Sequence, residues 1–246
     1  MALHMSTENV ILTDYRLPGE ALSALRELGA EPLCLPPFRK ISAPVEAHPD
    51  MLVYRQGHTL LVPAEYLDAN RRLFSALSCE VRGVTDSFGS QYPMDIRLNA
   101  LRVGNTVYGL RRGVSDEIIR TASRFVPVKQ GYTRCSAAVV AENAVMTADT
   151  GIAEALHKDG VDVLLIRQGG ILLPGYDMGF IGGCGGLLRK GLYVFFGRIE
   201  EHPQYRDMKA FADAHGVLLL SLWNGTLTDY GGMVSIPNRE FRKTEQ

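Results

Sequence analysis

Polar residues that could act as nucleophiles, acids, bases or cation ligands recur at intervals along this chain. They lie in short motifs such as AHPD, MDIR, TRCS and DYGGMVS, which follow predicted strands. The candidates are His48 and Asp50, Asp95 and Arg97, Arg134 and Cys135, Asp177 and Cys184, and Asp229 with Ser235. A thiol supplies a nucleophile, an imidazole moves protons, and several carboxylates near one point favour a bound cation.

Two cysteines are the candidate nucleophiles. Cys184 stands between two glycine pairs in GGCGG, and glycines, which lack a Cβ, allow a backbone or a ligand to approach closely. The alternative is a thiol that fills a small buried gap, as free cysteines often do. Cys135 follows Arg134, whose charge would lower the thiol pKa if both side chains face the site. Core packing is the alternative for Cys135 too.

His48 is the candidate acid or base, because the nearby Asp50 could orient and charge its imidazole. A histidine that caps a turn before proline is the alternative. Asp95 and Arg97 are two residues apart, so strand alternation predicts that both lie on one face of a strand. They would form an ion pair between neighbouring units, or the arginine would recognise a ligand carboxylate.

The elements that must position these residues are clearest in residues 131–166. The runs AAVVA and NAVMTA predict two strands joined by a tight turn at Glu142 and Asn143. A helix follows, capped at its start by Asp149 or Thr150 and ending at Gly160. VDVLLI then predicts a buried strand covered on both faces.

The same order of two strands, a helix and a third strand recurs along the chain. Downstream, GGLLRKGLYVFFGRI, QYRDMKAFADAHG and VLLLSLW form one copy. Upstream, NALRVGNTVYGL, SDEIIRTAS and RFVPV form a second, and DMLVYRQGHTLLV, AEYLDANRRLFSAL and CEVRGV form a third. The N-terminal copy, NVILTD, GEALSALRELG and AEPLCL, lacks its first strand. We therefore predict an α/β fold of five ββαβ units.

A further strand at the C-terminal end, GGMVSI, could take the place of the missing first strand. The units would then close into a ring, which avoids the exposed edges of an open array. The alternative is an ordinary α/β domain in which strands and helices only alternate. In a ring, the segments after the closing strands gather at one end, and the candidate residues gather with them.

Composition narrows the class of partner. The chain has 46% hydrophobic and 22% charged residues and a formal net charge of −1, so we expect a globular protein that binds neither nucleic acid nor membrane and lies in the cytoplasm.

Its four cysteines form no CxxC pair, which favours reduced thiols over zinc or disulfides. GGCGG matches neither common nucleotide-binding pattern. His157, His202 and His215 fall on or beside predicted helices, where we expect them to face solvent.

The five repeats, together with the segments EAHPDM, QYPMDI, GYTRCS, GYDMGFIGGCGG and TDYGGMV, resemble the pentein fold of guanidino-group-modifying enzymes, also called the α/β-propeller. Among penteins, the chain is most similar to an uncharacterised bacterial family. The resemblance implies a pseudo-fivefold ring closed by the C-terminal strand, in a single domain over residues 9–237. Residues 1–8 and 238–246 would be flexible termini.

The resemblance also implies a site in the central channel. In those enzymes a cysteine of the last unit attacks the guanidinium carbon, a histidine handles protons and carboxylates grip the cation. The matching motif here is DYGGMVS, which contains no cysteine near Met233, and Ser235 would need a base to become a nucleophile. The GFIGGCGG segment of unit four also lacks a nearby histidine.

We therefore expect a polar central pocket for a small cationic or zwitterionic ligand, guanidino or amino-acid-like. An amidino or guanidino hydrolase or transferase would use Cys184 or Cys135 as nucleophile, His48 as acid or base, and Asp50, Asp95, Asp177 and Asp229 as cation ligands. The alternative is a non-catalytic module that binds a ligand or a protein. We expect no cofactor and no metal site, and a homodimer is left open.

Overall fold

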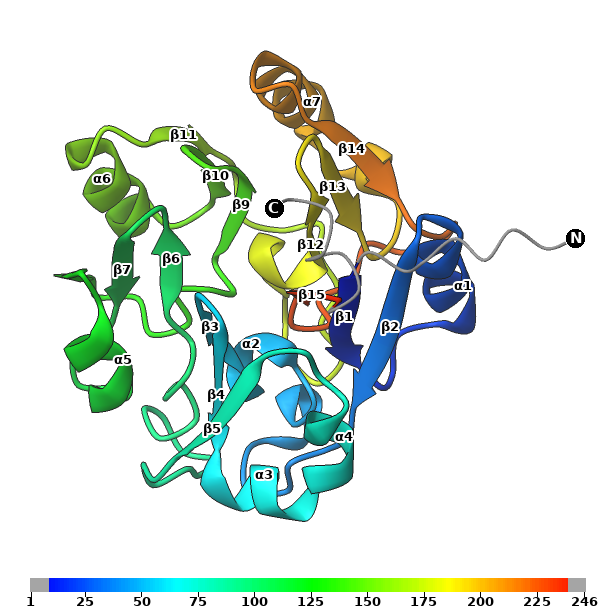
Figure 1. The fold of residues 1–246 in the computed structure, drawn as a ribbon. Coiled ribbons are helices and arrows are strands. Elements are labelled where there is room, and N and C mark those ends of the chain that lie inside the picture. The colour runs from blue at the N-terminus through cyan, green and yellow to red at the C-terminus, as the bar shows by residue number, and fades with distance from the viewer. Residues whose placement is uncertain (1–8, 239–246) are drawn as a thin grey trace, which may run out of the picture.

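The computed structural model describes residues 9–238, and the strands in that range form five three-stranded sheets. Figure 1 shows the sheets placed around a common centre. The strands, sheet by sheet, are β1 (Asn9–Asp14), β2 (Ala30–Leu35) and β15 (Val234–Pro237); β3 (Tyr54–Gln56), β4 (Thr59–Pro63) and β5 (Glu80–Val84); β6 (Leu101–Val103), β7 (Thr106–Gly109) and β8 (Arg124–Pro127); β9 (Ala137–Ala141), β10 (Ala144–Thr147) and β11 (Asp162–Leu165); and β12 (Gly185–Arg189), β13 (Leu192–Phe195) and β14 (Leu218–Ser221).

Each sheet has the same pairing pattern. Its middle strand pairs antiparallel with one neighbour and parallel with the other, and the parallel pair needs a crossover, which helices provide. The helices are α1 (Gly19–Glu27), α2 (Pro49–Leu52), α3 (Ala64–Ala69), α4 (Arg71–Ser75), α5 (Asp116–Thr121), α6 (Thr150–Lys158) and α7 (Tyr205–Ala214), with short 3₁₀ turns η1 (Ala43–Val45), η2 (Ile181–Cys184) and η3 (Ile199–Glu201). The predicted order of elements is confirmed in every unit.

The unit that contains α6 shows how local sequence sets these elements. The Asp149 side chain accepts a hydrogen bond from the Ile152 N–H at 2.8 Å and so caps the start of α6. Beyond its end, Gly160 has a φ of 76°, the left-handed conformation that glycine adopts without a Cβ clash. Glu142 and Asn143 connect β9 and β10, as predicted.

Three details of the predicted elements are wrong. The strand β11 is not buried along its length: Asp162 is exposed and Leu165 is 47% exposed. β11 is the edge strand of its sheet, and its two faces are only partly covered. The segment 50–52 lies in α2 rather than in a strand, since Pro49 begins a short helix there. The predicted helix over residues 64–77 is divided into α3 and α4 at Asn70, whose side-chain amide donates to the Tyr66 carbonyl.

The C-terminal strand β15 belongs to the same sheet as the N-terminal strand. It pairs antiparallel with β1, with Ser235 opposite Ile11, and β1 pairs parallel with β2 on its other side. In its sheet, β15 therefore occupies the position that the opening strand of a unit occupies in the other four.

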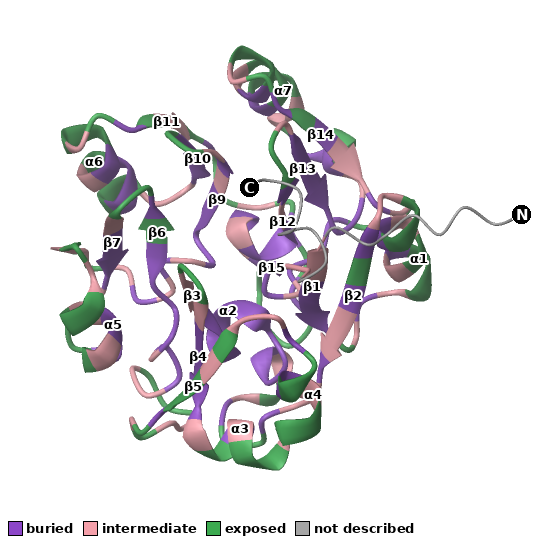
Figure 2. Cartoon of the chain, viewed as in Figure 1, coloured by how far each residue is buried: buried purple, intermediate pink, exposed green. Residues whose placement is uncertain are grey.

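The hydrophobic core is divided into clusters that each join neighbouring units. One contains Tyr54 and Leu61 together with Val107 and Ile118, and so joins the second and third sheets. Figure 2 shows buried residues concentrated on the inner strands, with exposed residues on the outer helices. Within residues 9–238, no helix is long and apolar enough to cross a membrane. The predicted flexible termini, apart from Asn238, lie outside the described residues.

Candidate functional site

A histidine and two carboxyl groups from three distant parts of the chain meet near the centre of the molecule. The His48 Nε2 atom lies 3.8 Å from Asp14 Oδ2, and its Nδ1 atom lies 3.7 Å from Asp229 Oδ1. Asp14 ends β1, His48 precedes α2, and Asp229 lies in the loop before β15. All three side chains are at most 2% exposed, so the cluster is almost completely desolvated.

Backbone groups fix the Asp229 carboxyl. Its Oδ2 accepts a hydrogen bond from the Phe180 N–H and its Oδ1 accepts one from the Gly231 N–H, both at 2.9 Å. Gly183 allows this placement, because a Cβ at that position would lie 1.9 Å from Asp229 Oδ1. The glycine-rich segment around η2 therefore makes room for a buried carboxyl group.

Asn99 links Cys135 to the chain around Asp50. Its side-chain Nδ2 lies 2.8 Å from Cys135 Sγ and donates to the Asp50 carbonyl at 3.2 Å, while its Oδ1 accepts from the Arg134 N–H at 2.9 Å. The Asp50 carboxyl is fully buried, and neither of its oxygens has a well-formed hydrogen bond in the described structure. The Arg134 guanidinium donates to the Met233 carbonyl at 2.9 Å.

Burial sets the charge state of the acidic groups. It raises the pKa of Asp229 to about 7, with the charge of Asp50 as the next cause. It also raises the pKa of Asp50 to about 6, against the lowering effects of Cys135 and Arg134. Near neutral pH Asp229 is therefore partly protonated, and Asp50 keeps its proton to a higher pH than an exposed aspartate would.

Burial also keeps the histidine and the thiols neutral. It lowers the pKa of His48 to about 3, and the charge of Arg16 adds to this effect. The Arg16 guanidinium itself pairs with the Asp14 carboxyl at 2.5 Å. Burial raises the pKa of both Cys135 and Cys184 well above its usual range.

A pocket of about 310 Å³ opens onto this cluster. The polar residues His48, Cys135 and Asp229 contribute to its lining, and Asp177 lies at its exposed edge. The remaining lining residues are aromatic or aliphatic: Val45, Met51, Tyr132, Leu173, Tyr176, Met178 and Phe180. The Tyr132 and Phe180 rings stack with centroids 6.1 Å apart, so they form one continuous wall.

Several predicted site residues come together here. His48, Cys135, Asp177 and Asp229 line the pocket, and the charges of Asp50 and Arg134 act on one another just behind it. Cys184 is fully buried outside the pocket lining, where its thiol donates to the Phe180 carbonyl at 3.2 Å. The structure therefore agrees with the alternative in which the Cys184 thiol fills a buried gap in the core.

Three other candidates lie elsewhere. Asp95 is buried and accepts a hydrogen bond from the Tyr132 hydroxyl at 2.6 Å, which supports the pocket wall from behind. Arg97 donates to backbone carbonyls, including that of Gly113. The two residues lie in an irregular segment with no ion pair between them in the described structure, so the predicted strand and the ion-pair alternative are wrong, while recognition of a ligand carboxylate by Arg97 stays a prediction. Ser235 lies in β15, outside the pocket lining.

The prediction for the helical histidines is correct in part. His157 is exposed, and His215 is partly exposed and lies 2.8 Å from Asp162. His202 is only 5% exposed, because it follows η3 and its Nδ1 accepts from the Gln204 N–H. The expectation that it faces solvent is therefore wrong.

Sequence reasoning missed three contributors to the site. Asp14 was assigned only to a strand, although a charged residue at the end of NVILTD, before the first helix, is a usable signal. Asn99 was missed, although it is a polar residue in the otherwise apolar run LNAL. Tyr132 sits three residues before Cys135, and nothing in its local sequence distinguishes it from a core aromatic residue.

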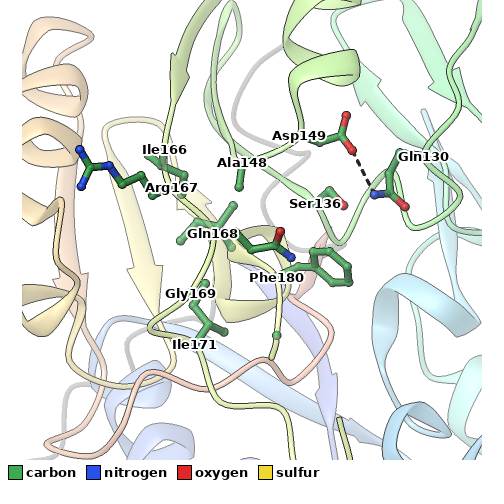
Figure 3. A pocket seen from close by; sticks show the side chains of 12 residues that line it. Gln130, Ser136, Ala148, Asp149, Ile166, Arg167, Gln168, Gly169, Ile171 and Phe180 are labelled. Carbon is green, nitrogen blue, oxygen red and sulfur yellow. Dashed lines mark hydrogen bonds between the residues drawn. The ribbon is translucent and has the colours of Figure 1, made fainter. Parts of the chain in front are cut away.

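A second, smaller pocket of about 60 Å³ lies beside the first and shares Phe180 with it. Figure 3 shows that Gln130 points toward Asp149, and the two side chains are hydrogen-bonded at 3.1 Å. Since Asp149 caps α6, these polar groups serve the fold. Across residues 9–238, no group of three or more His, Cys, Asp or Glu side chains is arranged to hold a metal ion.

Comparisons with known proteins place this geometry in context. Residues 12–234 match a family model described as "Family of unknown function (DUF6873)", and no curated protein matches the sequence. Among solved structures, agmatine deiminase from C. jejuni is similar, with a TM-score of 0.56 and 10% identity over 95% of this chain and 94% of that one. The inosamine-phosphate amidinotransferase of Streptomyces griseus has a TM-score of 0.55 and 12% identity, over 95% of each chain. DDAH from Pseudomonas aeruginosa has a TM-score of 0.52 and 10% identity, over 88% of this chain and 93% of that one.

Proposed function

We propose, from the premise that this chain belongs to DUF6873, a family of unknown function, and has the pentein fold, that its pocket binds a small organic cation with a guanidinium or ammonium group. The predicted resemblance to penteins is confirmed for the fold. The observation that carries the proposal is a buried acidic floor beneath aromatic walls, with Asp229 lining the pocket and Asp50 behind it.

Electrostatics explain why a cation suits this pocket. A buried carboxylate without a counter-charge is costly, so burial raises the pKa of both Asp50 and Asp229, and Asp229 is partly protonated at neutral pH when the pocket is empty. A bound cation supplies the missing charge and lets the carboxyl groups ionise. Binding at neutral pH is therefore expected to release protons.

The walls favour the same class of ligand. Tyr132, Tyr176 and Phe180 line the pocket, and the face of an aromatic ring attracts a desolvated cation. A planar guanidinium can also stack on such rings, whereas a neutral sugar or an anion gains neither interaction.

Isothermal titration calorimetry with butylguanidine tests the proposal. We expect saturable binding at pH 7, with an apparent enthalpy that changes with the ionisation enthalpy of the buffer because protons are released. The Asp229→Asn variant should bind at least about tenfold more weakly, since it loses the carboxyl charge of the floor. Asp68→Asn, at an exposed position outside the pocket, is the matched control. No binding by the wild-type protein would refute the proposal.

A second candidate function is covalent catalysis by Cys135, favoured by its place in the pocket lining with Asn99 Nδ2 beside its sulfur. Its thiolate would attack the guanidinium carbon, a C–S bond would form, and the amine would leave with a proton. Water would then attack the same carbon, break the C–S bond, release the amidino carbon as urea and return the thiol. A cation held by Asp229 would lower the thiol pKa, which burial raises in the empty pocket. Amine release from butylguanidine that is abolished in Cys135→Ser would support catalysis, and binding without turnover would support a non-catalytic module.

We also propose that the five sheets form a closed pseudo-fivefold ring in one domain over residues 9–237. The pairing of β15 with β1 supports this. A cytoplasmic location, the absence of nucleic acid and membrane partners, and a homodimer are proposals that rest on the sequence alone.

A further inference from the structure

We infer that the pocket selects a linear molecule with a positive group at each end and no carboxylate, such as an α,ω-diamine or an aminoalkyl guanidine. The inference rests on the proposed function and deepens it by naming the substrate class. It follows from the placement of charge along the pocket rather than from the acidic floor alone.

The pocket is lined by one buried and one exposed carboxyl group. Asp229 lines it deep inside and is 2% exposed, whereas Asp177 lines it at the exposed edge. Tyr176 and Met178, which flank Asp177, are 47% and 40% exposed and so mark the mouth. Asp177 takes part in no ion pair within the described structure, so its exposed carboxyl group is open to a ligand.

The position of Asp177 is set by the chain around it. Leu172 forms a parallel bridge with Thr228, and its carbonyl accepts from the Asp229 N–H at 2.8 Å. At the tip of the loop, Gly175 has a φ of 95° and lies against Pro44, since a Cβ there would approach the proline ring to 2.6 Å. One hydrogen-bonded frame thus holds the loop of Asp177 to the segment that carries Asp229.

Apart from His48, Cys135 and the two carboxyl groups, the lining is aliphatic or aromatic. Val45, Met51, Leu173 and Phe180 contribute aliphatic and aromatic surface, which suits a methylene chain. The volume of about 310 Å³ is at the lower end of the roughly 300–1,000 Å³ of small-molecule sites. That is enough for two charged groups joined by a short alkyl chain.

A ligand carboxylate would find no partner in this pocket. Among the described residues that line it, none is Lys or Arg. Two arginines act on the cluster from outside the lining: Arg16 pairs with Asp14, and Arg134 donates to the Met233 carbonyl. An α-carboxylate would instead approach Asp177 or lie against the apolar walls, and both placements are unfavourable.

Matched pairs of compounds test the inference by calorimetry on the full chain. 1,4-Diaminobutane differs from ornithine, and 4-aminobutylguanidine from arginine, only in the carboxylate. We expect the compound without the carboxylate to bind at least about tenfold more tightly in each pair. Butylamine, which lacks the second charge, should bind about twofold to fivefold more weakly than 1,4-diaminobutane, because the Asp177 carboxyl is exposed and its attraction is partly screened.

The Asp177→Asn variant separates this inference from the proposed function. It should weaken 1,4-diaminobutane by the same twofold to fivefold and leave butylamine unchanged, while Asp68→Asn changes neither. If ornithine and arginine bind as tightly as their decarboxylated partners, the inference is overturned and the cation pocket stands. If no compound binds, including butylamine, both are overturned.

Discussion

At the scale of the residue, the central feature is a set of ionisable groups whose pKa values are shifted by burial toward the neutral form. Asp50 and Asp229 have raised pKa values, His48 has a lowered pKa, and the Cys135 thiol has a raised one. Each shift has desolvation as its largest cause. The empty pocket is therefore poised to respond to a ligand that brings positive charge.

The two candidate thiols should differ in accessibility and share low reactivity. We expect iodoacetamide to label neither Cys135 nor Cys184 rapidly at pH 7, because burial disfavours both thiolates. As the pH rises, Cys135 should react first, since it lines the pocket. Mass spectrometry with site assignment measures this, and the half-buried Cys34 serves as an internal reference.

Rapid labelling of Cys135 with an apparent pKa below about 8.5, the value of a free thiol, would contradict the raised pKa and strengthen the case for catalysis. Rapid labelling of Cys184 before denaturation would contradict its burial.

The Asp50 carboxyl should make stability depend on pH. Its native pKa of about 6 lies above the unfolded value of about 3.8, so the native state keeps a proton that the unfolded chain has lost. Stability from this group is complete below the unfolded pKa and is lost as the pH rises through about 6. In Asp50→Asn this loss is absent, so the variant should gain about 1 kcal/mol relative to wild type between pH 5 and pH 8.

Urea unfolding at both pH values measures that gain. The exposed Asp68→Asn substitution controls for a general effect of removing a negative charge, and should leave the pH dependence unchanged. An Asp50→Asn profile parallel to wild type would show that Asp50 ionises normally in the native state.

At the scale of the element, glycine-rich turns decide whether the site can form. The η2 segment packs closely enough on the Asp229 carboxyl that only glycine fits at position 183. The glycines of GGCGG were predicted to allow close approach of another group, and Gly183 does so. The cysteine between the glycine pairs, Cys184, packs in the core.

Gly183→Ala should therefore disturb both stability and ligand binding. Its Cβ would overlap Asp229 Oδ1, and relief requires movement of the carboxyl or of η2. We expect a loss of about 1–3 kcal/mol in the free energy of unfolding, together with weaker binding of butylguanidine. Gly19→Ala is the matched control, because no atom lies within 4 Å of its added Cβ, and it should change stability by less than about 0.5 kcal/mol. Equal effects of the two substitutions would refute the close approach.

At the scale of the whole molecule, the N-terminal and C-terminal strands share one sheet. Ile236 of β15 is fully buried and packs in the cluster that also contains Leu12 and Leu52. The last strand thus joins the first and second units into one core, although more than 200 residues separate it from β1 in sequence.

Truncation of the Ile236 side chain tests how far the stability of the fold depends on β15. Ile236→Ala should lower the free energy of unfolding by about 2–5 kcal/mol, since it removes a fully buried aliphatic group. Leu218→Ala on the edge strand β14, where the side chain is 57% exposed, should cost less than about 0.5 kcal/mol. Chemical denaturation measures both, and a similarly small effect of Ile236→Ala would argue against an integral β15.

The sequence by itself determined the repeated order of strands and helices, because hydrophobic period, helix caps such as Asp149 and turn glycines such as Gly160 act within a few residues. It also placed His48, Cys135 and Asp229 among the candidates. Only the tertiary structure decided which polar groups meet: Asp14 approaches His48, Asp95 turns away to Tyr132, and Cys184 lies outside the pocket lining. Such contacts join segments far apart in the chain, so they depend on how the sheets pack and not on any local pattern.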